Sequence, residues 1–101
     1  MGASVAAIDL AAPAAAWAAL GFAVEDDGCA VGATLLRLGR EPGWALRDAT
    51  GEGDVDGIPT ERATWAQPPA AVHPNGAVSV DHVVVATGDV DRTFAALHDA
   101  G

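Results

Sequence analysis

Apolar and polar residues alternate in blocks along the chain, and the first blocks predict a strand followed by a helix. Residues 4–10 form a short apolar stretch, which ends before Pro13, a residue that suits the first turn of a helix. The alanine-rich run over residues 13–20 has Trp17 as a large anchor, and Gly21 follows as a left-handed cap. A strand and a helix of about two turns are therefore expected here.

Glycine and aspartate then separate several short apolar segments. The Asp27-Gly28 pair supplies the positive φ angles that a tight hairpin requires, between strands at residues 22–24 and 29–31. Further strands are expected between glycines, at residues 34–38 and 44–47. The pattern predicts an α+β fold in which residues 1–50 form a βαβββ module.

The middle of the chain is polar and rich in glycine and proline. Residues 51–57 read Gly-Glu-Gly-Asp-Val-Asp-Gly, and residues 58–76 contain four prolines with little apolar periodicity. Such composition is typical of a surface connector, which we expect over residues 51–78.

The last quarter of the chain repeats the strand and helix order of the beginning. The β-branched run over residues 79–87 predicts a strand buried on both faces. Asp89 is placed to cap a helix over residues 90–100, with Val90, Phe94 and Leu97 on one apolar face. Residues 79–101 are therefore expected to start a second, similar module.

This last quarter resembles the opening of a module in the vicinal oxygen chelate superfamily, which includes glyoxalases, bleomycin-resistance proteins and extradiol dioxygenases. The likeness is carried by Val80-Asp81-His82-Val83-Val84-Val85, by Gly88-Asp89-Val90-Asp91-Arg92-Thr93-Phe94 and by the helix that ends at Gly101. Leu20-Gly21-Phe22 in the first half is a looser match to the end of that family's first helix.

The resemblance implies two paired βαβββ modules around a sheet cavity that holds a divalent metal. Period-two geometry in the expected strand sets Val80, His82 and Val84 on one face, turned away from the helix. His82 is the one candidate metal ligand, and Zn, Ni, Fe and Mn are not distinguishable. The first strand offers no His or Gln, and Asp48 is the nearest carboxylate to the fourth, so the first module is poor in ligands.

Simpler interpretations stand beside these. A histidine in a valine-rich strand is commonly a hydrogen-bonded structural residue, and Trp44 is commonly part of a core. If Trp44 lies on a cavity strand, it can stack on an aromatic substrate. Trp44, Val80 and Val84 are the candidates for lining a substrate cavity, and no catalytic residue is assigned.

Charge and composition limit the classes of partner that the protein is expected to bind. The formal net charge is −9, from 14 acidic and 5 basic residues, which disfavours nucleic acid and anionic membranes. No apolar run is long enough for a membrane span, and the lone Cys29 has no disulfide partner, so we expect a soluble, cytoplasmic protein.

The sequence therefore predicts a glyoxalase-like protein that binds a small molecule in a sheet cavity, with metal-dependent lyase, isomerase or dioxygenase chemistry if it is an enzyme. Two alternatives stay open. One is a metal-free binding or sequestering module, and the other is an interaction protein that forms a homodimer through a sheet edge or by pairing of modules.

Overall fold

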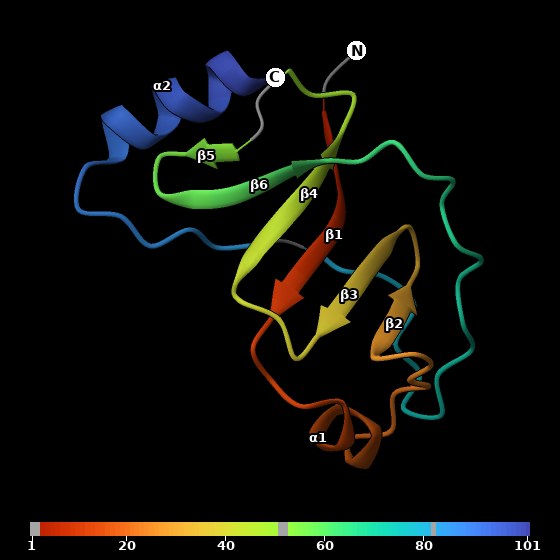
Figure 1. Cartoon of the computed structure of the whole chain (residues 1–101). Coiled ribbons are helices and arrows are strands. Elements are labelled where there is room, and N and C mark those ends of the chain that lie inside the picture. Colours follow the sequence, from red (N-terminus) through yellow and green to blue (C-terminus); the bar gives the residue numbers. More distant parts are fainter. Residues whose placement is uncertain (1–2, 51–52, 82) are drawn as a thin grey trace.

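The computed structural model describes residues 3–50, 53–81 and 83–101. Within them six strands and two helices follow one another (Figure 1): β1 (Ser4–Leu10), α1 (Ala14–Ala19), β2 (Gly28–Val31), β3 (Thr34–Leu38), β4 (Gly43–Arg47), β5 (Gly53–Val55), β6 (Ile58–Arg62) and α2 (Val90–Ala100). The α+β class expected from the sequence is confirmed, and β1, α1, β2, β3 and β4 follow the expected order.

The strands form one mixed sheet in the order β2-β3-β1-β4-β6-β5. The central strand β1 runs parallel to β3 and antiparallel to β4, while β4 and β6 are also parallel. The remaining pairs, β2 with β3 and β5 with β6, are antiparallel hairpins. Because β1 is paired on both sides, its register with β3 and β4 sets which of their side chains share a face of the sheet.

The two faces differ in what covers them, and we name them accordingly. The helix face carries Ile8, Leu36 and Trp44, whose clusters include Trp17 of α1 at one end and Leu97 of α2 at the other. The open face carries a cluster of alanines, against which Leu35 and Trp65 pack but no residue of either helix in the described chain. The alanines are Ala6, Ala7, Ala45 and Ala63.

The turn before β2 differs in detail from the expected hairpin. Asp26 and Asp27 hold the positive φ angles of 53° and 59°, and Gly28 is the first residue of β2. Glu25 and Gly28 exchange two backbone hydrogen bonds of 2.9 Å across this two-residue turn. The strand expected at residues 22–24 is absent, because the N–H of Ala23 is bound by a histidine side chain instead of a neighbouring strand.

Part of the expected connector at residues 51–78 is sheet. β5 and β6 are joined by a turn in which Asp56 and Gly57 have φ of 52° and 84°, and Asp54 Oδ1 accepts the N–H of Gly57 at 2.6 Å. The hairpin then adds to β4. The alternation of apolar and polar residues in this hairpin is too short and too polar to predict strands from the sequence. The hairpin forms because it pairs in register with β4. The division of the chain into modules stays a prediction.

The strand expected at residues 79–87 is wrong for the residues that the structure describes there. Residues 79–81 and 83–87 pair with no strand, and the segment crosses the helix face between the two helices, behind the sheet in Figure 1. Val80 packs on one apolar cluster of this face and Val85 on the other. The described β-branched residues therefore cover a face of the sheet instead of joining a ladder. We call the described residues of this stretch, 77–81 and 83–87, the crossing segment.

Helix α2 confirms the expected bounds, but of its expected apolar face Leu97 alone packs on the sheet among the described residues. Asp89 caps it by accepting the N–H of Arg92 at 3.0 Å. Thr93 and Ala100 are its buried residues, whereas Val90 and Phe94 remain 72% and 69% exposed. The cause is Asp56 in the β5–β6 turn, which accepts hydrogen bonds from Arg92 Nε at 2.7 Å and from the Thr93 hydroxyl.

The far end of α2 meets the beginning of the sheet. The N–H of Thr50 donates to Ala100 O at 2.7 Å, and the N–H of Ala3 donates to Gly101 O at 3.3 Å. The first described residue of the chain and its last residue are therefore hydrogen-bonded neighbours. No helix in the described chain has the length and apolarity needed to cross a membrane.

Candidate functional site

The middle of the helix face is the candidate site, because the crossing segment lies over it between the two helices. Ile8 on β1 and Trp44 on β4 lie opposite each other in the β1–β4 register. The crossing segment lies over them without strand pairing. The crossing segment passes so close to Gly32 that a Cβ at this position would lie 2.7 Å from Val78 O. Side-chain contacts and the close approach at Gly32 hold the crossing segment over the sheet. Because it forms no strand pairing, space remains between it and the sheet.

Three hollows open around this point, and all three are lined by Ile8 and Val83. Two of them, of about 390 and 410 Å³, also share Trp44, and we call them the Trp44 hollows. The third, of about 340 Å³, is lined by Trp17, Phe22 and Val80. Each volume is within the range of small-molecule sites, and the linings are mainly apolar.

Trp44 presents an apolar ring to the two hollows that carry its name. Its side chain is largely buried, and its indole N–H donates to Thr60 Oγ1 at 2.9 Å. The Thr60 hydroxyl in turn donates to Ile58 O at 2.9 Å. Because this chain satisfies the indole N–H, the ring is held in one orientation and offers a ligand its π surface and no hydrogen bond.

The structure brings the three expected cavity residues to the same face. Trp44 and Val80 each line two hollows, and Val84 lines one of the Trp44 hollows while remaining 78% exposed. Whether they contact a substrate stays a prediction. The expected metal ligand, His82, lies outside the described residues, although Asp81 and Val83 on either side of it line a hollow.

The described residues offer no ready metal centre. No three or more His, Cys, Asp or Glu side chains in residues 3–50, 53–81 and 83–101 come together as a metal-binding group. His98 is in the last turn of α2, where its ring stacks on Phe94 at 6.2 Å. A metal on the helix face would therefore need His82 together with donors that the described chain does not gather.

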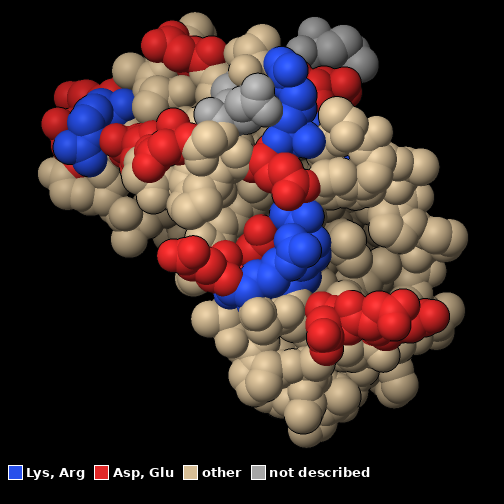
Figure 2. Space-filling view, in the orientation of Figure 1, with Lys and Arg blue, Asp and Glu red and all other residues tan. Residues whose placement is uncertain are grey.

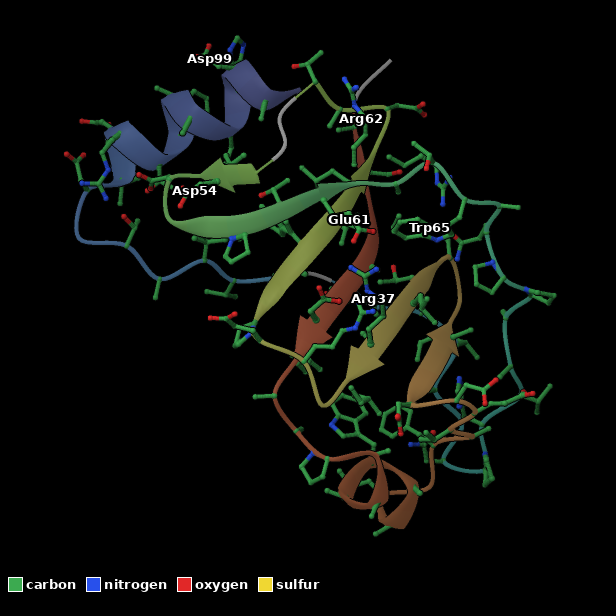
Figure 3. All side chains as sticks on the ribbon, viewed as in Figure 1. Arg37, Asp54, Glu61, Arg62, Trp65 and Asp99 are labelled. Carbon is green, nitrogen blue, oxygen red and sulfur yellow. The ribbon has the colours of Figure 1, made fainter. Side chains whose placement is uncertain are left out.

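The sequence pattern missed an ion-pair cluster on the open face. Arg37 on β3 donates from Nη2 to Asp9 Oδ2 at 3.0 Å and from Nε to the other oxygen, and its Nη1 lies 3.1 Å from Glu61 Oε2 (Figure 3). Burial alone lowers the pKa of Arg37, but the hydrogen bonds and charges of Asp9 and Glu61 outweigh it and raise the pKa above its ordinary value. The guanidinium stays charged, with its neighbours already neutralising it.

Trp65 completes this cluster from the segment after β6. Its ring lies 5.3 Å from the Arg37 guanidinium carbon, and its carbonyl accepts a hydrogen bond of 2.7 Å from Arg47 Nη1. Arginines on this face lie between acidic side chains (Figure 2). The signal available in the sequence was opposite charge on two expected strands, Asp9 and Arg37, but their contact depends on the parallel β1–β3 register.

Cys29 is not a candidate nucleophile. Its side chain is 1% exposed in the core of the helix face, and burial raises the pKa of its thiol. Its nearest polar partner is His73, with Sγ 4.0 Å from Nδ1. The thiol is therefore held neutral.

No protein-family model matches the chain, and no curated protein or solved structure matches it either. Function must therefore be argued from the helix face and its hollows.

Proposed function

We propose that this chain binds a small, mainly apolar molecule on the helix face, in the Trp44 hollows. The observation that supports this most is the nature of the cover. Helices pack on both ends of the face, but its middle is covered by an unpaired segment that leaves two hollows of about 390 and 410 Å³ against Ile8, Trp44 and Val83.

The lining indicates the class of ligand. Trp44 offers a ring surface whose N–H is already used by Thr60, so affinity would come from stacking and apolar contact. The net charge of −9 repels anions from the whole molecule. A neutral aromatic or aliphatic compound fits these conditions best, and the binding needs no metal.

A second candidate adds metal chemistry at His82. The resemblance to the vicinal oxygen chelate superfamily is its source, and the strand, helix and three-strand order of β1 to β4 is the observation that favours it. A divalent metal would supply Lewis-acid polarisation of a substrate oxygen for glyoxalase-type chemistry. Calorimetric titration with Zn²⁺, Ni²⁺ or Mn²⁺ tests it, because heat that is unchanged in His82→Ala removes His82 from any site.

The edge-paired homodimer stays a prediction with no structural observation in its favour. The edge strand β2 is bonded by Ala71 N–H to Ala30 O at 3.1 Å, and α2 lies against the other edge strand, β5 (Figure 1). Sedimentation at micromolar concentration tests it.

Fluorescence titration with N-phenyl-1-naphthylamine, a neutral probe of apolar sites, tests the main proposal. We expect Trp44→Leu to weaken binding by about tenfold, because an aromatic contact is lost. Trp65→Leu removes an indole from the open face and is expected to leave binding unchanged. Equal loss in both variants would contradict binding at the Trp44 hollows.

A second pair of variants avoids any change in a buried residue. Val84→Ser alters an exposed side chain that lines a Trp44 hollow, and we expect about threefold weaker binding from the lost apolar surface. Val72→Ser is the matched control, because Val72 is 92% exposed and lines none of the three hollows. Identical affinities for Val84→Ser and Val72→Ser would count against the proposal.

A further inference from the structure

One buried histidine joins the chain after β6 to the edge of the sheet. We call residues 68–76 the strap; they run beside β2, and their Ala71 N–H donates to Ala30 O. The ring of His73 in this strap is 4% exposed. Its Nδ1 accepts the N–H of Ala23 at 2.9 Å, and its Nε2 lies 2.8 Å from Ala30 O.

These partners assign the protonation state of the ring. A backbone N–H can donate but not accept, and a carbonyl oxygen can accept but not donate. Nδ1 must therefore carry a lone pair and Nε2 a proton, so His73 is a neutral imidazole that bridges two segments. Both ring nitrogens are used.

The surroundings offer nothing to a charged ring. The Phe22 ring meets it edge-on at 5.5 Å, and the titratable group facing it from β2 is the neutral Cys29 thiol. Helix α1 and the rest of the strap contain no charged residue. The turn before β2 carries Glu25, Asp26 and Asp27, but none of them forms an ion pair with His73 among the described residues.

We propose that His73 is an acid-sensitive latch that holds the strap on the edge of β2. A second proton on the ring must sit on Nδ1, where it would point at the N–H of Ala23, donor against donor. Losing that bond while burying a positive charge favours release of the ring. Ala30 O is shared by His73 Nε2 and Ala71 N–H, so the strap bond at Ala71 loosens with it.

Release would uncover the edge of β2, whose outward backbone groups are then free to pair with another strand. It would also loosen Ala77 and Val80, which follow the strap and line the hollow beside Trp17. That second consequence rests on the proposed function, whereas the latch itself does not.

Amide hydrogen exchange at pH 7.5 and pH 5.5, corrected for the intrinsic exchange rate, tests the latch. We expect protection of the Ala23 and Ala71 amides to fall by about tenfold or more at the lower pH. The amide of Ala63, bound to Leu46 O at 2.8 Å, is the internal control and should keep its protection. Equal loss at Ala63 would mean general unfolding and would overturn the proposal.

His73→Gln is the decisive variant. A glutamine amide can accept from Ala23 and donate to Ala30 at once, but it does not gain a proton in this range. We expect its strap amides to be equally protected at both pH values, while His98→Gln behaves as the unmodified protein. Acid release that persists in His73→Gln, or its absence from the unmodified protein, would overturn the latch, and neither result bears on ligand binding at the Trp44 hollows.

Discussion

The two faces of the sheet differ in the side chains they carry and in what covers them. On the helix face, large apolar side chains are covered at both ends by helices, and the middle is left with space around Ile8, Trp44 and Val83. On the open face, the floor is made of alanines, and Arg37 spans it to join Asp9 and Glu61. The hollows at the middle of the helix face are mainly apolar. The open face also borders a hollow, of about 460 Å³, but Arg37, Arg40 and acidic side chains line it.

This difference indicates which face of the sheet is better suited to bind a ligand. Charges on the open face already have partners, so a ligand there must displace an internal ion pair. Apolar surface on the helix face has no such competitor, and a ligand that fills a hollow gains contacts that the folded chain lacks. The following experiments test the contrast, beginning with the largest expected effect.

Breaking the ion pair of the open face should cost the most. Arg37→Met leaves the largely buried Asp9 carboxylate with one more distant arginine among the described residues, Arg40 at 3.8 Å. We expect a loss of about 2–3 kcal/mol in the free energy of unfolding, measured by urea denaturation. Arg62→Met, an exposed arginine of β6, is the control and should change it by about 0.5 kcal/mol or less. Similar effects of the two substitutions would show that the cluster contributes little.

A larger side chain should lower the stability of the protein on the open face but not beside the hollows of the helix face. Ala45 on the open face is fully buried, so Ala45→Leu must displace its neighbours, and we expect a cost of about 1–3 kcal/mol. Val83→Leu adds one methylene beside the hollows, and we expect a change of about 0.5 kcal/mol or less. Thermal unfolding of both variants decides the point; a cost at Val83 as large as that at Ala45 would argue that the hollows are closed in solution.

The contact between the Asp56 carboxylate and helix α2 should stabilise the protein less at low pH. The hydrogen bond from Thr93, followed by that from Arg92 and its charge, lowers the pKa of Asp56 below its ordinary value. The carboxylate therefore stabilises the fold above the pKa of the unfolded state, near 4, and this stabilisation is lost as the pH falls through the lower folded value.

Asp56→Asn removes this contribution. We expect the variant to be less stable than the unmodified protein at pH 7, and the difference in urea midpoint to narrow below about pH 4. Asp91→Asn, at an exposed position in the first turn of α2, controls for the loss of one negative charge near the helix. A difference that stays constant down to pH 2 would contradict the assigned cause.

Local signals in the sequence predicted much of the framework. Pro13 and Gly21 bracket α1, and Asp89 marks the start of α2, because caps and breakers act within a few residues. The β-branched run at residues 79–87 misled for a physical reason. Composition reports that a segment buries apolar side chains, but not whether its backbone finds a free place in a sheet.

Three residues that line the hollows were named from the sequence, but the geometry of the hollows was not, and their contact with a ligand stays a prediction. Trp44, Val80 and Val84 do lie on one face, yet the hollows exist because the crossing segment is unpaired, which depends on the whole strand order. The Arg37 cluster depends on the register of parallel strands far apart in sequence. Likewise, the burial of His73 follows from where the strap returns to β2, which no local signal in the sequence predicts.

The bond between Ala3 and Gly101 makes the molecule a natural subject for circular permutation. A short glycine linker can join these positions, and new ends can be opened at Val72, a residue that is 92% exposed. Such a rearranged chain would keep every described strand intact and would place His73 next to a new chain end.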